Sequence, residues 1–350
     1  MTTSFLSVRT QFENLGDLLI NRELISLLSE RGDLVIDASG VPQWFIDALR
    51  LPSGAKIVRG RIKFMYSLVG HRLRGRPAFY FFLPGGNFGD YSTLNFLKRT
   101  VLLFPWYVLK FLGVKFCQIG TSAERLGPRH TRYLKLRNPL LHAFYVRDLE
   151  SSSVLSEAGV KHHGLLPDFA FNLFTTESTN NDGSGSVCFS FRTDQHASQL
   201  GDCYRIIDRV VSLLPKSTTY WFSVQVERDR KGVEELRELL LKHHKIEAGV
   251  FEETRQIARM QEFYRHTESV VSNRLHVLLL AASGGARVVA YADHMNQKIT
   301  GLFRTIDRVD LLISPQDVGS SKLDKALHAP QINGIEQRQV LVNGIQKIFS

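Results

Sequence analysis

Short apolar runs of strand length alternate along this chain with amphipathic stretches of helical length. The runs are rich in β-branched and aromatic side chains, whereas the stretches between them repeat apolar residues three and four positions apart. Such alternation is typical of parallel sheets covered by helices on both faces. Strands are predicted at residues 34–37, 78–83, 116–119, 143–146, 186–191, 220–224, 269–272 and 287–291, and helices at 18–30, 152–158, 204–214, 233–241 and 277–282.

A polar segment near the middle of the chain divides this pattern in two. Residues 175–186 contain Thr, Ser, Asn, Gly and acidic residues, and no side chain that could join a core. The chain has 350 residues, which is enough for two domains of ordinary size. The sequence therefore predicts two doubly wound α/β domains that face each other across a cleft. The predicted parts are an N-terminal domain at 1–174, a linker at 175–186, a C-terminal domain at 187–328 and a C-terminal helix at 329–350.

Composition indicates the compartment. No apolar run reaches the roughly 20 residues that span a bilayer. The chain does not open with a basic segment followed by a long apolar one, which argues against secretion. Its three cysteines, Cys117, Cys188 and Cys203, fit neither a disulfide framework nor a paired-cysteine metal site. We therefore expect a reducing cytoplasm, and no bound metal.

The formal net charge of +10, from 44 basic and 34 acidic side chains, favours anionic partners. Lys and Arg are scattered along the chain, and no known nucleic-acid-binding motif organises them, so nucleic acid is not expected as a partner. Residues 94–116 are apolar and aromatic with basic residues interspersed. This stretch either rests on an anionic membrane surface or packs on its own sheet.

The most informative motif lies between an apolar strand and the helix predicted at 277–282. Its polar members are Ser272, Asn273, Arg274 and His276. Amides and the dipole at a helix start favour anions, Arg adds a fixed charge, and His can move protons near neutral pH. A structural His beside an apolar helix is the alternative. The motif predicts an active site for an anionic, phosphate-bearing donor.

A glycine-rich segment, Gly85–Asp90, follows another apolar strand and precedes a helix-like stretch. Its glycines permit close backbone approach, and amides at a helix start suit an anion. The alternative is a tight strand-to-helix turn in which the Asp caps the helix. The segment lacks the Lys of a P-loop and the spacing of the dinucleotide fingerprint. Its candidate binding residues are Gly85, Gly86, Asn87 and Asp90, and a shorter echo of the motif adds Asn14 and Asp17.

Two further predicted strands end in an arginine, Arg147 and Arg192. An Arg at such a place can donate forked hydrogen bonds to a carboxylate or phosphate. The alternatives are a surface pair of Arg147 with Asp148, with Ser151 capping the next helix, and a solvated strand end at Arg192. Lys298 would lie near the start of the helix after the last strand, or else be a solvated helix residue.

In this order the motifs resemble those of the polysaccharide pyruvyl transferase family. Six motifs of the family occur here in the family's order. They are Asn-x-Gly-Asp at 14–17, Gly-Gly-Asn-Phe-Gly-Asp at 85–90, Arg-Asp/Glu-x-x-Ser at 147–151, Pro-Asp-x-Ala-Phe at 167–171, Ser-x-Arg at 190–192 and Ser-x-Arg-Leu-His at 272–276. The resemblance departs at Pro84, where family members often have Gly, and at 118–122, which follow the family's Pro-Gln-Ser pattern only loosely. These departures concern the acceptor more than the donor.

The resemblance implies two Rossmann-like domains of the GT-B type, with the acceptor at 1–174 and phosphoenolpyruvate at 187–328. It implies transfer of a pyruvyl group from phosphoenolpyruvate to two hydroxyls of one sugar in a surface or exopolysaccharide intermediate. The products are a cyclic ketal and phosphate, and no cofactor is implied. Arg274 and His276 match family residues that contact phosphoenolpyruvate, with Arg147 and Lys298 as further contacts. His276 would then transfer protons while the cations bind phosphate and carboxylate.

We expect the enzyme to work in the cytoplasm on a glycan acceptor. If that acceptor is a lipid-linked oligosaccharide, as the resemblance suggests, the positive charge would help hold the protein at the inner face of the plasma membrane. Two other functions are compatible with the same two-domain fold. One is a glycosyltransferase that uses a nucleotide sugar, and the other is a non-catalytic glycan-binding or assembly protein.

Overall fold

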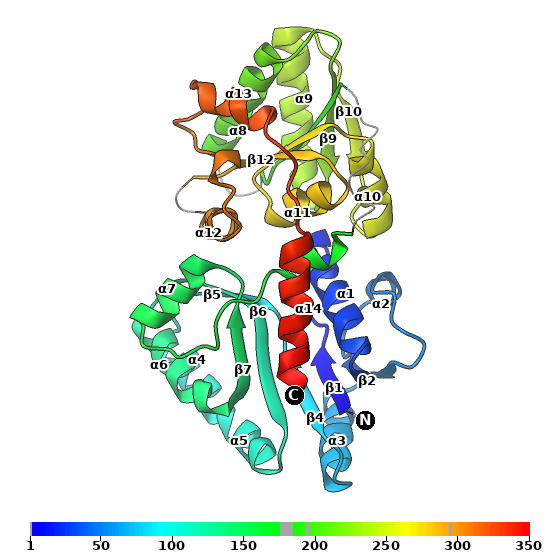
Figure 1. Cartoon of the computed structure of the whole chain (residues 1–350), viewed down its shortest axis with the longest axis vertical. Helices are drawn as coiled ribbons and strands as arrows, with labels where there is room; N and C mark the ends of the chain where they lie inside the picture. The colour runs from blue at the N-terminus through cyan, green and yellow to red at the C-terminus, as the bar shows by residue number, and fades with distance from the viewer. Residues whose placement is uncertain (1, 176–184, 194–196, 294–295) are drawn as a thin grey trace. The chain divides into compact units, whose positions relative to one another are not determined.

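A computed structural model of the chain describes residues 2–175, 185–193, 197–293 and 296–350. Within these residues lie one seven-stranded and one six-stranded sheet (Figure 1), and every strand pair in them is parallel. Each sheet forms the centre of one compact unit. The first unit is Met1–Phe12, Ile20–Phe169 and Gln339–Ser350, and the second is Glu13–Leu19 and Ala170–Arg338. The prediction of two Rossmann-like α/β domains is confirmed.

The two units exchange short segments at both ends of the chain. Helix α1 (Leu15–Ser29) begins in the second unit and continues into the first, and α14 (Ile335–Phe349) does the same. The apolar pattern is unbroken through both helices, so the sequence offers no sign of this exchange. Most of the predicted linker, residues 176–184, lies outside the described residues.

The first unit has the strand order β3-β2-β1-β4-β6-β5, with β7 paired to β6. Its strands are β1 (Thr2–Ser7), β2 (Gly32–Asp37), β3 (Lys56–Val58), β4 (Ala78–Phe82), β5 (Gly85–Gly89), β6 (Lys115–Leu126) and β7 (Leu141–Val146). The helices that connect them are α2 (Gln43–Ala48), α3 (Arg61–Leu73), α4 (Thr93–Val101), α5 (Leu103–Phe111), α6 (Pro128–Arg137) and α7 (Leu149–Glu157).

Successive side chains of β4 point to opposite faces of the first sheet, and each face has its own helices. Tyr80 joins a buried cluster with Phe64 of α3 and Leu109 of α5. Phe79 and Phe81 lie on the other face against Phe349 of α14, with ring centroids 4.6 and 5.9 Å away. The sheet is therefore covered by helices on both faces, as the alternating pattern predicts.

The glycine-rich segment differs from the sequence-based expectation. Gly85–Gly89 forms strand β5, which pairs in parallel with the second half of β6, while β4 pairs with the first half. The next helix, α4, starts only at Thr93, where the Ser92 side chain accepts a hydrogen bond from the amide of Asn95. The predicted strand-to-helix turn is therefore wrong, because the glycine backbone extends the sheet instead of opening a helix.

The second unit has the strand order β10-β9-β8-β11-β12-β13. Its strands are β8 (Ser186–Ser190), β9 (Thr219–Val224), β10 (Gly249–Glu252), β11 (Ser269–Ser272), β12 (Arg287–Tyr291) and β13 (Leu312–Ile313). Its helices are α8 (Ala197–Leu213), α9 (Arg230–His244), α10 (Ile257–Arg265), α11 (Leu275–Ser283), α12 (Gln297–Thr305) and α13 (Ser321–Leu327). Numbered from β8, this is the 3-2-1-4-5-6 order of a dinucleotide-binding Rossmann domain.

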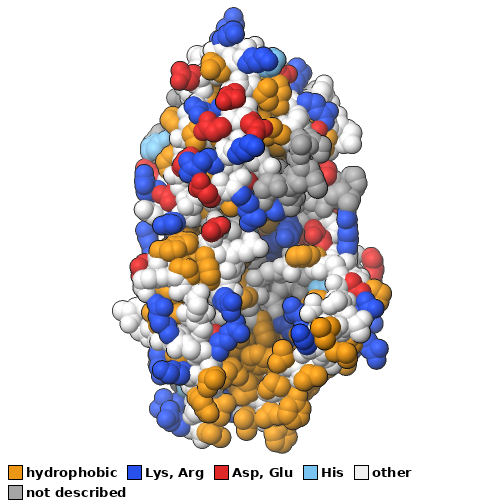
Figure 2. All heavy atoms as spheres, turned by 180° about the vertical axis from the view of Figure 1, so that it is seen from behind, with side chains coloured by type: hydrophobic (Ala, Val, Ile, Leu, Met, Phe, Trp, Pro, Cys, Tyr) orange, Lys and Arg blue, Asp and Glu red, His pale blue; other side chains and the backbone are white. Residues whose placement is uncertain are grey.

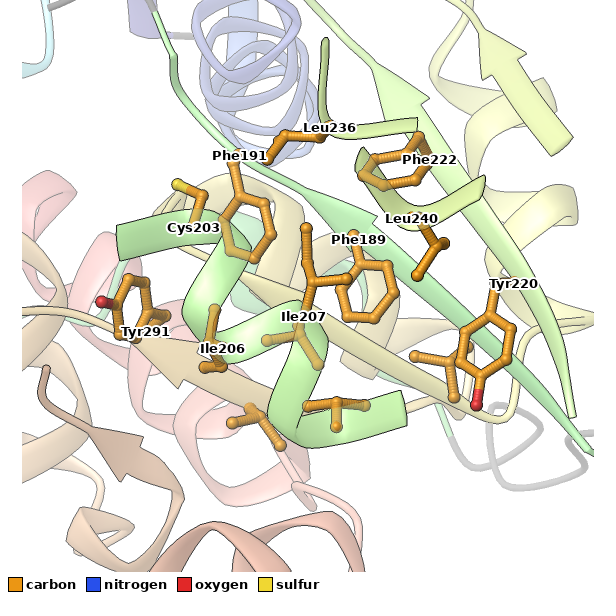
Figure 3. Packing of buried hydrophobic residues seen from close by; sticks show 14 of the residues in the cluster. Phe189, Phe191, Cys203, Ile206, Ile207, Tyr220, Phe222, Leu236, Leu240 and Tyr291 are labelled. Atoms are coloured by element: carbon orange, nitrogen blue, oxygen red, sulfur yellow. The ribbon is translucent and has the colours of Figure 1, made fainter. Parts of the chain in front are cut away.

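The core of the second unit forms where α8 and α9 pack on one face of this sheet (Figure 3). Phe189 of β8 and Phe222 of β9 lie among Ile206 and Ile207 of α8 and Leu240 of α9. The opposite face is covered by α10 and α11, which contact each other. Among the described helices of the whole chain, none combines the length and apolar character needed to cross a bilayer.

Candidate active site

The strand order of the second sheet reverses between β8 and β11. From β8 the chain proceeds to β9 and β10 on one side, whereas β11, β12 and β13 lie on the other. Ligands of open parallel sheets bind beyond the carboxyl ends of the strands at such a reversal. Ser190 and Ser272 end the two strands and are register partners. The topology therefore brings two of the predicted motifs, 190–192 and 272–276, to the position where a ligand is expected.

Hydrogen bonds hold these two strand ends together. The buried Ser272 hydroxyl donates to the carbonyl of Ser190 at 2.6 Å and accepts from the amide of Arg274 at 3.0 Å. The Asn273 side chain accepts from the amide of Arg192 at 2.6 Å and donates to its carbonyl at 3.3 Å. Ser272 and Asn273 thus fix the backbone from which Arg192 and Arg274 project.

Arg274 is held by an aspartate that the sequence does not single out. Its guanidinium forms an ion pair with Asp229, which is 2% exposed, whereas the Arg274 side chain is 17% exposed. Asp229 also accepts a hydrogen bond from the amide of Thr193 at 3.2 Å. A charged run such as residues 227–230 is typical of a solvated loop, yet Asp229 is buried at the start of α9, where it pairs with Arg274.

His276 is the second residue of α11, and its ring lies against Gly16. A Cβ atom built on Gly16 would be 2.5 Å from Nδ1 and 3.0 Å from Cγ of His276, so only glycine leaves room for the ring. Asn14 orders this turn, since its side chain accepts from the amide of Gly16 at 3.0 Å and donates to Asp17 at 3.3 Å. The Asn14–Asp17 echo is therefore a helix start that packs on the candidate catalytic histidine.

Lys298 follows β12, the strand beside β11, and is the second residue of α12. Its side chain is half-buried, as is that of Arg192. Because β8, β11 and β12 are adjacent and parallel, their carboxyl ends share one edge of the sheet. That edge carries Arg192, Arg274 and Lys298. Among the described residues, no group of three or more His, Cys, Asp or Glu side chains forms a metal-binding cluster.

Arg147 belongs to the first unit and is buried in an ion-pair cluster. Its guanidinium lies 2.9 Å from Asp168 and 3.7 Å from Asp148, and its side chain is 6% exposed. Asp148 caps α7 by accepting from the amide of Ser151 at 2.7 Å. The alternative of a surface pair with Ser151 as the cap is therefore wrong, because the pair is buried and Asp148 is the capping residue. The contact of Arg147 with phosphoenolpyruvate stays a prediction.

Asp90, at the end of the glycine-rich segment, also has a structural partner. Its carboxylate accepts from the amide of His130 at 2.9 Å, in the first turn of α6. Desolvation acts to raise the pKa of Asp90, but hydrogen bonds from the amides of His130, Tyr91 and Arg129 outweigh it and lower the pKa. Asp90 thus caps a helix distant in sequence. The Asn87 side chain lies outside the described part of the structure, and Gly85 and Gly86 are exposed on β5.

Comparison with known proteins places the chain in a family. A family model described as polysaccharide pyruvyl transferase matches residues 14–294. No curated protein matches the sequence. The matched range includes Asn14, Gly16, Asp229, Arg274 and His276, that is, the candidate site except for Lys298.

Solved structures with the same fold include enzymes of nucleotide-sugar metabolism. A glycosyltransferase from Rickettsia africae is 9% identical with a TM-score of 0.60, covering 99% of this chain and 97% of that one. A UDP-GlcNAc 2-epimerase from Methanocaldococcus jannaschii is 11% identical with a TM-score of 0.55, covering 99% and 100%. A putative UDP-N-acetylglucosamine 2-epimerase from Listeria monocytogenes is 12% identical with a TM-score of 0.54, covering 97% and 95%. At these identities the likeness concerns the fold alone, which is of the GT-B type.

Proposed function

The chain belongs to the polysaccharide pyruvyl transferase family, and we propose that it transfers a pyruvyl group from phosphoenolpyruvate to a sugar of a surface-polysaccharide intermediate. The observation that carries the proposal is the placement of Arg274 and His276 at the start of α11, where the strand order of the second sheet reverses. Phosphoenolpyruvate carries a phosphate and a carboxylate, so several cations should contact it.

In the proposed reaction, two hydroxyl oxygens of one sugar form bonds to C2 of phosphoenolpyruvate, and the bond from C2 to the phosphate oxygen breaks. One hydroxyl proton ends on C3, which becomes a methyl group, and the other leaves with the phosphate. His276 is placed to deliver or remove one of these protons. Arg274 binds the donor's anionic groups, with Lys298 and Arg192 as further contacts. No cofactor is needed for this balance.

The role of His276 is tested by phosphate release from phosphoenolpyruvate in the presence of acceptor glycans. We expect His276→Ala to lower kcat by about 10²–10⁴-fold, with no change in thermal midpoint. His328→Ala, at an exposed histidine that ends α13, is the matched control and should keep full activity. Mass analysis of the glycan should show a gain of one pyruvyl ketal per phosphate released. Full phosphate release by His276→Ala would contradict the assignment.

A glycosyltransferase reaction with a nucleotide sugar is the alternative, because solved structures with this fold include a glycosyltransferase. Titration calorimetry with phosphoenolpyruvate and with a panel of nucleotide sugars separates the two reactions. We expect phosphoenolpyruvate to bind and Arg274→Lys to weaken that binding. Tight binding of a nucleotide sugar without binding of phosphoenolpyruvate would contradict the proposal. Activity toward glycans with phosphoenolpyruvate would exclude a non-catalytic assembly protein.

The proposal includes a cytoplasmic location at the inner face of the plasma membrane and a lipid-linked acceptor. The basic character of the chain supports it, because an anionic leaflet attracts cations.

A further inference from the structure

Helix α4 of the first unit is amphipathic, yet it has no buried residue. Leu94, Leu97 and Val101 are spaced three and four positions apart, so they lie on one side of the helix. All three are exposed, Val101 to 71%. The apolar side of a helix in a globular protein normally covers the core. This one faces solvent, so the alternative that residues 94–116 pack on their own sheet holds for the buried side of α5 but not for α4.

Helix α5 continues the same surface. It buries Leu103 and Leu109, but its outward side is also apolar, with Phe104, Val108 and Phe111 at helical spacing. Phe111 is 94% exposed, which is unusual for a large aromatic residue in a soluble protein. The helix therefore has apolar residues on both sides, although only one side has a partner in the described chain.

Helix α3 lies beside α5 and adds a third exposed stripe. Ile62, Tyr66 and Leu73 share one exposed side of α3, opposite Phe64, which is buried in the cluster that holds α5. The side chain of Arg72 donates to the carbonyl of Leu112 at 3.0 Å and so joins the ends of the two helices. We call the exposed side of these three helices the α3–α5 face. Figure 2 shows it as hydrophobic side chains gathered at the end of the molecule where Figure 1 draws α3 and α5.

Acidic residues are nearly absent from the segment that forms this face. Between Arg61 and Lys115 there are nine Lys and Arg residues and one acidic residue, Asp90. Most of the net charge of +10 therefore comes from this part of the chain, because a single acidic residue offsets its nine basic ones. Among them, Lys63 and Lys98 are exposed on α3 and α4, the helices that carry two of the apolar stripes.

We propose that the α3–α5 face is a docking surface for an anionic phospholipid membrane. Exposed apolar and aromatic side chains among cations, with almost no acidic residue, are the chemistry of helices that lie in a membrane interface. A second copy of the chain is a poorer occupant. A twofold dimer would place this face against itself, and therefore cation against cation. The proposal stands on this surface alone and needs no assumption about the reaction.

The test is flotation of the full-length chain with vesicles of phosphatidylcholine alone or mixed with phosphatidylglycerol. We expect binding to the anionic vesicles only, weakening as salt is raised. Phe104→Ser with Phe111→Ser should weaken it by about tenfold or more. Lys63→Ser and Lys98→Ser should each weaken it roughly fivefold. All four side chains are exposed, so the variants should fold, which circular dichroism checks.

Matched controls lie in the second unit. Leu241→Ser and Lys231→Ser change an exposed apolar and an exposed basic residue of α9 and should leave binding unchanged. Equal binding to neutral vesicles, or no binding to anionic ones, would overturn the proposal. So would a dimer in sedimentation that the Phe104 and Phe111 substitutions abolish, because the face would then be covered by a second copy. The vesicle experiments do not include phosphoenolpyruvate. A failure of membrane binding would therefore not contradict the proposed reaction, and a failure of the proposed reaction would not contradict membrane binding.

Discussion

Arg147 of the first unit and Arg274 of the second both lie between a parallel strand and the helix that follows it, yet their surroundings differ. Each directly follows or nearly follows a parallel strand, precedes a helix and pairs with an aspartate distant in the chain. Arg147 is enclosed with two carboxylates, Asp148 and Asp168. Arg274 pairs with Asp229, is more exposed, and lies at the reversal of strand order beside His276. Similar motifs therefore end in different surroundings: Arg147 is buried between two carboxylates, whereas Arg274 is partly exposed at the place where a ligand of the second sheet is expected.

The largest effect should come from removing the positive charge of Arg147 in the first unit. Arg147→Met removes the positive charge that pairs with two buried carboxylates, so we expect the free energy of unfolding to fall by about 3–5 kcal/mol. Urea denaturation followed by circular dichroism measures it. Arg274→Met should cost less, because Asp229 keeps its hydrogen bond from Thr193. Similar losses in both variants would mean that the two arginines are equivalent.

Arg274→Lys keeps the charge but removes the fork of donors. We expect phosphoenolpyruvate to bind about 2 kcal/mol more weakly, or roughly thirtyfold, with little change in stability. Titration calorimetry measures the affinity. Arg147→Lys should bind phosphoenolpyruvate normally if Arg147 is structural. An equal loss of affinity there would instead support the donor contact that the family resemblance implies.

Gly16→Ala should disturb the candidate site of the second unit without replacing any of the side chains proposed to bind or react. The added methyl group would press on the ring of His276, and a shift of less than an ångström in a catalytic group costs roughly tenfold or more in kcat/KM. Gly201→Ala in α8, with open space around it, is the control. It should keep full activity and stabilise the helix by about 0.5–1 kcal/mol. Unchanged activity in Gly16→Ala would show that the ring has room to adjust.

The smallest effect should come from Asp90, a second structural carboxylate of the first unit. Its pKa is lowered in the folded chain, so its stabilisation is present above the ordinary value of 3.8 and is lost as pH falls through the folded pKa. The thermal midpoint of Asp90→Asn should therefore lie below wild type at neutral pH and approach it in acid. If the difference in thermal midpoint between wild type and Asp90→Asn does not change with pH, the hydrogen bonds to the Asp90 carboxylate are not the cause of that difference.

Several features could be predicted from sequence because they depend on residues near one another. Apolar runs predict eight of the thirteen strands that the structure describes, and miss β1, β3, β5, β10 and β13. The strand-to-helix junction at Ser272–His276 is confirmed. The partners of this motif could not be predicted. Asp229 lies 45 residues before Arg274, and an Asp in a charged turn gives no sign that it is buried.

The other failures share a physical cause. Gly85–Gly89 has the composition of a turn, but a free edge on the long strand β6 makes a strand more favourable. The stretch at 94–116 has the composition of a core helix. Its local pattern does not reveal which apolar side packs against the rest of the protein and which stays exposed. The need for glycine at position 16 cannot be predicted from local sequence, because it depends on the volume of a ring more than 200 residues away in the chain.

The exchange of Glu13–Leu19 into the second unit has a consequence for how such genes can be recombined. A chimera joined in the central linker would inherit His276 from one parent and the turn that packs on it from the other. Parents that differ in this turn would give a protein with two intact sheets and a poor fit between the turn and the His276 ring. Exchange of the second unit between relatives should therefore also require the short segment that encodes Glu13–Leu19, taken from the same parent.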